Sequence, residues 1–145
     1  MTLSDILKPE AVKVVSETMS KKRLFQKIGE VAHDVYGCAG ARCAEALIER
    51  EALGPTGVGH GIALPHARIS GIDRVHGLFF KLEHPIEFDA VDRQPVDLVF
   101  ALIAPEEAGV HHLKALALVS RTMRDAGTCG KLRANDQPDT LHTVL

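Results

Sequence analysis

The sequence predicts one α/β domain over residues 1–145, with a mixed β-sheet and helices packed on both of its faces. Apolar residues recur at helical spacing before residue 54 and after residue 110. The middle of the chain instead carries short apolar runs separated by turn residues. A chain of 145 residues matches one ordinary domain, which is large enough to bury a core without disulfides or metals.

The first helix is expected to begin after Ser20 and to end at Gly37. A serine side chain caps free amide groups at a helix start, and glycine accepts the left-handed conformation at a helix end. A helical turn near residues 4–7 and a valine-rich strand at 11–16 precede this helix.

A second helix is expected from about Ala41 to Leu53. Gly54 should close it in the left-handed conformation, because Pro55 cannot continue a helix. The expected buried face of this helix comprises Ala44, Leu47 and Ile48.

The middle of the chain predicts the sheet, with a turn at His84–Pro85. The segment 96–104 is nearly all apolar, which is typical of a strand buried on both faces. The other expected strands are 61–64, 75–82 and 86–88. Helices should follow at 110–125, 128–134 and the C-terminus.

Composition excludes several classes of protein. The chain has 17 Lys and Arg against 19 Asp and Glu, a net charge of −2, and only 4% aromatic residues. Nucleic-acid binding favours a basic face and stacking aromatics, so we expect no nucleic-acid partner. The longest apolar run, 98–104, is too short for membrane insertion, and no signal peptide opens the chain. Three loosely spaced cysteines indicate reduced thiols in a soluble intracellular protein.

The glycine-rich segment, residues 54–61, has four glycines in eight positions. Such a segment can present several amide groups to an anion. It lacks the ending of a P-loop, and it follows a helix where a dinucleotide fingerprint would follow a strand. A turn-rich connection is the simpler interpretation of the segment by itself.

Two histidines are notable for their positions. His66 follows Pro65, which belongs at a strand end or a sheet edge. His112 shares a helical stripe with Leu116, Val119 and Met123, so it should face the core, whereas His111 should face solvent. An inward histidine is more often structural than functional. No histidine or cysteine spacing predicts a metal site, and no serine-hydrolase elbow is present.

These residues together resemble the enzyme IIA proteins of the fructose/mannitol type in the bacterial phosphotransferase system. Residues 57–66 resemble the active-site segment of that family, and 46–51 also fit it. Residues 90–102 and the His112-Leu113-x-x-Leu116 pattern are most similar to the nitrogen-regulatory branch. The resemblance implies the IIA fold over 1–145 and a cytoplasmic phosphocarrier without a cofactor. It also implies that Nε2 of His66 accepts phosphate from an HPr-like phosphocarrier, the nitrogen-branch paralogue.

Phosphoryl transfer to His66 would need groups that stabilise the charge on the phosphoryl oxygens, such as a second histidine, an arginine and backbone amides. His112 and Arg50 would stabilise the phosphoryl charge, although Arg50 also suits the C-terminal end of a helix dipole. The phosphate loop would comprise Gly57, Gly59, His60 and Gly61. His60 stands where many relatives carry Asn.

Three functions remain open. In the first, the phosphorylation state of a nitrogen-regulatory carrier controls partner proteins that the sequence does not identify. In the second, a sugar-specific IIA subunit passes phosphate to the IIB domain of a permease. In the third, a binding module docks partners and is never phosphorylated. The basic cluster Lys21–Arg23 is either a solvated surface or a docking patch for an acidic partner.

Overall fold

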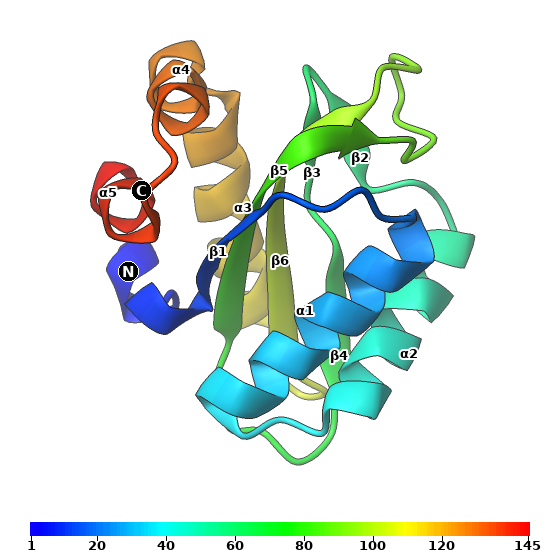
Figure 1. Cartoon of the computed structure of the whole chain (residues 1–145). Helices are drawn as coiled ribbons and strands as arrows, with labels where there is room; N and C mark the ends of the chain where they lie inside the picture. The colour runs from blue at the N-terminus through cyan, green and yellow to red at the C-terminus, as the bar shows by residue number, and fades with distance from the viewer.

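The computed structural model describes all 145 residues, which build a six-stranded mixed sheet (Figure 1). The strand order is β1-β5-β6-β3-β2, and β4 also pairs with β6. β6 runs antiparallel to β5 and parallel to both β3 and β4, which lie end to end along it. The strands are β1 Val12–Val15, β2 Gly57–Gly59, β3 Ile62–Ala63, β4 His66–Ile69, β5 His76–Ile86 and β6 Val96–Pro105.

Helices cover both faces of this sheet, as the sequence predicts (Figure 1). α1 and α2 lie on one face, and α3, α4 and α5 lie on the other. Residues 98–104 of β6 are all buried between these layers. No helix combines the length and the apolar character needed to cross a membrane. The helices are α1 Lys21–Tyr36, α2 Gly40–Ala52, α3 Val110–Arg124, α4 Ala126–Ala134 and α5 Pro138–Val144, preceded by 3-10 turns at Leu3–Asp5 and Pro9–Ala11.

The boundaries of α1 are confirmed. The Ser20 hydroxyl accepts a hydrogen bond from the Arg23 amide at 3.1 Å, and Gly37 is left-handed with φ 71°. α1 and α2 then cross closely at Gly29 and Gly40. A Cβ atom on Gly29 would overlap the carbonyl oxygen of Gly40, so the close packing of these two helices requires glycine.

Two expectations for α2 are wrong, one about how the helix ends and one about its buried face. Leu53 ends the helix in a right-handed conformation, and Gly54 is not left-handed. Ile48 is 39% exposed, because it lies at the margin of the buried face of the helix, about 40° beyond Ala44. Side-chain hydrogen bonds, described below, hold the connection after α2.

The strand predictions are corrected at three places. β5 continues through His84–Pro85 to Ile86, where we expected a turn followed by a separate strand at 86–88. That separate strand does not form, because Ile86 ends β5 and residues 87–88 are irregular. The pairing of β5 with β6 shifts between Lys81 and Ile86, so Pro85 interrupts no ladder hydrogen bond. Two strands were not anticipated: β2, inside the glycine-rich segment, and β4, which begins at His66.

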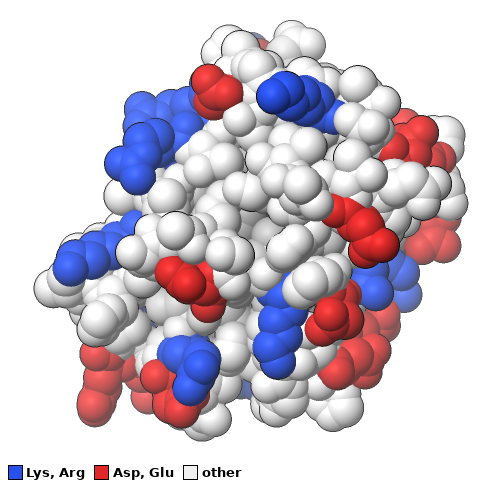
Figure 2. All heavy atoms as spheres, turned by 90° about the vertical axis from the view of Figure 1, so that its left-hand side faces the viewer, with Lys and Arg blue, Asp and Glu red and all other residues white.

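The charges are dispersed on the face of the molecule that carries α5 and the chain termini. Figure 2 shows Lys and Arg interspersed with Asp and Glu there, around uncharged surface. This face therefore presents no basic area of the kind that binds nucleic acid.

Candidate functional site

His66 is positioned by the interruption between β3 and β4. Leu64 and Pro65 separate these strands, and the Pro65 carbonyl still accepts a hydrogen bond from the Leu102 amide of β6 at 2.9 Å. The chain turns enough to bring Nδ1 of His66 within 2.8 Å of the Leu64 carbonyl oxygen. A carbonyl can only accept, so the proton is on Nδ1 and the lone pair is on Nε2. The ring is half-buried.

The electrostatic surroundings keep the His66 ring neutral. Burial lowers the pKa of His66, its hydrogen bond to Leu64 partly offsets this, and the charge of Arg50 lowers it again. A neutral imidazole with a free Nε2 lone pair is a nucleophile near neutral pH.

His112 faces His66 from the first turn of α3. It is only 6% exposed, which confirms the inward orientation expected from its helical stripe, and His111 is exposed as expected. The two ring centroids are 5.7 Å apart, with 64° between the ring planes. The structure thus brings together two histidines that are 46 residues apart in the sequence.

Arg68 determines which nitrogen of His112 carries the proton. Nε of Arg68 donates to Nδ1 of His112 at 3.1 Å, so the proton of the neutral ring is on Nε2. That Nε2 is buried and has no hydrogen-bond partner. Burial, followed by the nearby His66 and Arg68, lowers the pKa of His112 to about 4. The ring therefore offers one unused N–H donor beside His66.

Sequence reasoning missed Arg68, although a signal for it exists. Residues two apart on a strand share a face, so His66 and Arg68 of β4 point to the same side. Because β4 itself was not predicted, this relation could not be used.

Arg50 lies in the last turn of α2, close enough for its charge to lower the pKa of His66. Its Nη1 donates to the Gly54 carbonyl at 3.0 Å, beyond the helix end. The guanidinium thus both satisfies backbone after the helix and acts electrostatically on His66. The expected role of Arg50 in stabilising a phosphoryl group stays a prediction.

Glu51 holds the connection that follows Arg50. Its carboxylate accepts hydrogen bonds from the amide of Thr56 at 3.0 Å and from the Thr56 hydroxyl, and it pairs with Lys21 at 3.2 Å. The Glu51 side chain is only 7% exposed. Lys21 also donates to the Phe88 carbonyl at 3.0 Å, so this member of the basic cluster is committed to the fold.

The glycine-rich segment forms the β2–β3 hairpin. Its two turn residues, His60 and Gly61, have φ of 58° and 78°, as a type I′ turn requires. Asn is favoured at the first of these positions, and His tolerates the same left-handed region. The His60 amide donates to Asp92 Oδ2 at 2.9 Å, and its carbonyl accepts from Arg133 at 2.7 Å. The His60 amide, which we expected to hold phosphate, is therefore occupied by Asp92. The role of Gly57, Gly59 and Gly61 in binding phosphate stays a prediction.

No group of three or more His, Cys, Asp or Glu residues is arranged to hold a metal ion. The three cysteines, Cys38, Cys43 and Cys129, are buried and unpaired as disulfides.

Comparison with known proteins identifies the family of the chain. Residues 5–145 match the family described as "Phosphoenolpyruvate-dependent sugar phosphotransferase system, EIIA 2". The chain is 41% identical to a nitrogen regulatory protein of Bradyrhizobium diazoefficiens, over 100% of this chain and 95% of that protein. It is 38% identical to a nitrogen regulatory protein of Escherichia coli, over 100% and 90%.

A solved structure agrees as well. The nitrogen regulatory protein IIA-Ntr from Neisseria meningitidis superposes with a TM-score of 0.89 at 32% identity, covering 98% of this chain and 97% of that one. The fold, the full-length match and the identity all indicate one family. The chain therefore belongs to the EIIA 2 family of the phosphoenolpyruvate-dependent sugar phosphotransferase system and is similar over its whole length to the family's nitrogen regulatory proteins.

Proposed function

We propose that this chain is a phosphohistidine carrier of a nitrogen-regulatory phosphotransferase system, with His66 as the acceptor. The single observation that carries the proposal is the 2.8 Å contact between Nδ1 of His66 and the Leu64 carbonyl. This contact leaves the Nε2 lone pair free to attack phosphorus. In the proposed step, Nε2 forms a bond to the phosphorus of a donor phosphohistidine while the donor's own N–P bond breaks. The donor imidazole leaves with that electron pair.

The surroundings of His66 suit the charges that this step creates. The His66 ring gains positive charge as the N–P bond forms, and the Leu64 carbonyl stabilises it through Nδ1–H. The phosphoryl oxygens need donors, and His112 has an unused Nε2–H. Arg50 adds a positive charge that already acts on His66. Phosphoryl transfer needs mainly such positioning and charge stabilisation.

We propose an HPr-like phosphocarrier, the nitrogen-branch paralogue, as the donor. Exposed apolar side chains support docking of a protein near the site. Val110 and Leu113, which are 61% and 63% exposed, share the first turn of α3 with His112. Leu53, 85% exposed, follows the helix that carries Arg50. We propose that these side chains contribute to one docking surface, since contiguous exposed apolar patches are typical of protein interaction sites. The reaction would take place in the cytoplasm.

The output that we propose is regulatory. A phosphoryl group adds about −1.5 to −2 charges near neutral pH, by analogy with phosphoserine. Arg50 and His112 would compensate part of this charge, while the rim of the site would change its potential. Partner proteins would then bind the two forms differently.

The test is phosphorylation with phosphoenolpyruvate, the first enzyme of the system and each of two purified donors, HPr and its nitrogen-branch paralogue. We expect one acid-labile phosphate, mapped to His66 by mass spectrometry, formed faster with the paralogue. His66→Ala should keep a native amide NMR spectrum and accept none.

Each alternative has its own outcome. Preference for HPr, with onward transfer to a IIB domain, would support the sugar-specific function. Absence of label from both donors would leave only a binding module. Label on residue 112 of the native protein would reverse the roles of the two histidines.

A further inference from the structure

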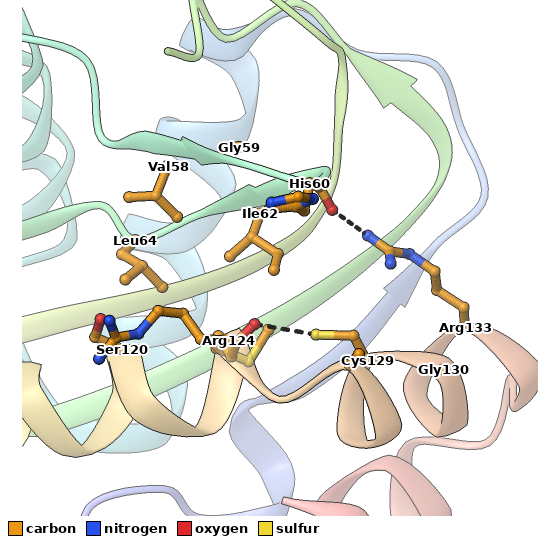
Figure 3. A pocket seen from close by; sticks show the side chains of 12 residues that line it. Val58, Gly59, His60, Ile62, Leu64, Ser120, Arg124, Cys129, Gly130 and Arg133 are labelled. Carbon is orange, nitrogen blue, oxygen red and sulfur yellow. Dashed lines mark hydrogen bonds between the residues drawn. The ribbon is translucent and has the colours of Figure 1, made fainter. Parts of the chain in front are cut away.

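A cavity of about 580 Å³ opens beside the β2–β3 hairpin, and neither His66 nor His112 lines it. The hairpin forms one wall, and the junction of α3 and α4 forms the other (Figure 3). Its volume is typical of small-molecule sites, which are mostly apolar with a few placed polar groups. Val58, Ile62, Leu64 and Met123 supply apolar surface.

Two arginines line the cavity, and they differ in their partners. Arg133 is neutralised by Asp97, with two hydrogen bonds of 2.9 Å, and also donates to the His60 carbonyl. The guanidinium of Arg124 makes no ion pair and no hydrogen bond within the chain. Arg124 is an exposed residue, so the cavity has one solvent-accessible cation without a counter-charge from the chain.

Ser120 places a hydroxyl next to that cation. Residues four apart on a helix lie on one face, and long side chains lean toward the helix N-terminus. Arg124 should therefore extend over the turn that carries Ser120. Figure 3 shows this: the Arg124 side chain runs toward Ser120 along α3, on the side that faces Leu64. A guanidinium and a hydroxyl together suit a carboxylate.

We propose that this cavity binds a small molecule with an apolar body and a single carboxylate. The carboxylate would lie against Arg124 and Ser120, and the apolar body would pack against Ile62, Leu64 and Met123. This inference goes beyond the carrier function and does not require phosphorylation of His66. Leu64 connects the cavity with His66, because its side chain lines the cavity and its carbonyl oxygen accepts a hydrogen bond from Nδ1 of His66.

The test uses naphthaleneacetate as the probe and the uncharged, nearly isosteric naphthaleneacetamide as its match. Binding to the full chain is measured by calorimetry and by amide NMR shifts. We expect naphthaleneacetate to bind about fivefold to tenfold more tightly than the amide. The shifts should centre on residues 58–64 and 120–133.

Three variants locate the site. Arg124→Gln should reduce the affinity for naphthaleneacetate to that for the amide, whereas Arg121→Gln, on the same helix but outside the cavity, should change nothing. Gly130→Leu should abolish binding of both compounds. Gly130 lines the cavity, and a Cβ atom there meets no other atom within 4 Å, so a leucine can be placed at the cavity wall without a clash.

Three outcomes would overturn the proposal. The first is no binding of naphthaleneacetate up to about 5 mM. The second is equal affinity for the two compounds, and the third is binding that survives Gly130→Leu. In the first case, a weaker docking of the phosphate donor to Arg124→Gln would indicate that the cavity accommodates a protein side chain and not a small molecule.

Discussion

Acidification should destabilise this protein through His112, and the structure sets the size of the effect. The pKa of His112 is lowered to about 4 in the folded chain from 6.5, the ordinary value that an unfolded chain has. As pH falls below about 6.5, the unfolded chain binds a proton at this ring while the folded chain does not. Stability is therefore lost between pH 6.5 and pH 4, and the loss is complete below the folded pKa.

The magnitude follows from proton linkage. The two pKa values correspond to a loss of about 0.2 kcal/mol already present at pH 7 and about 2 kcal/mol at pH 5. Part of the lowering of the His112 pKa comes from the charge of His66. Because His66 is only half-buried, solvent screens part of that contribution. We expect His112 to account for about 1 to 2 kcal/mol between pH 7 and pH 5.

The assay compares the native protein with His112→Gln, whose amide does not titrate and can still accept from Arg68. Urea unfolding, followed by circular dichroism at both pH values, gives four free energies of unfolding. The pKa values of His66 and His76 are also lowered, mainly by burial. Both histidines remain in the variant. The contribution of His76 cancels in the difference of differences, because nothing couples it to His112, whereas the electrostatic coupling between His66 and His112 is counted with His112.

The reasoning is refuted if both proteins lose the same stability, within about 0.5 kcal/mol, between pH 7 and pH 5. An NMR titration of the His112 ring provides a direct check. Its inflection should lie near pH 4, and an inflection near 6.5 would show that the ring is not desolvated.

Three further predictions concern the fold and the proposed switch. Glu51→Gln should cost about 1 to 3 kcal/mol of stability in urea unfolding, because the buried Thr56 groups and Lys21 lose a charged partner. Unchanged stability would show that this buried carboxylate is dispensable. Gly29→Ala should cost about 1 to 3 kcal/mol by overlap with α2, whereas Gly130→Ala, which meets open space, should be neutral or stabilising. Equal losses would contradict the close crossing of the helices. Phosphorylation of His66 should change the affinity of a regulated partner by about fivefold to 150-fold in calorimetry, and equal affinity for both forms would favour a relay to a transporter.

The helices were predictable because their signals are local. The Ser20 cap, the left-handed Gly37 and the inward stripe of α3 all depend on neighbours within a turn or two, and the structure confirms each. The end of α2 was not predictable, because Glu51 and Arg50 bind the following connection through side chains. A glycine near a helix end is not a cap when other hydrogen bonds satisfy the backbone.

The strands failed where their pairing is nonlocal. β4 is a strand only because β6, more than 30 residues later, supplies its hydrogen bonds. β5 passes through Pro85 because its register with β6 shifts at that place. Composition near Pro85 indicates a turn, and only the partner strand determines that there is none.

The sequence by itself determined the fold class and singled out His66, His112 and Arg50. It left open which atoms face one another. The protonation of the two rings depends on the Leu64 carbonyl and on Arg68, which reach the histidines only after β4 pairs with β6 and α3 packs onto the sheet. A tautomer is set by hydrogen-bond distances of about 3 Å. Distances on that scale between residues 44 positions apart, such as Arg68 and His112, are a property of the packed chain alone.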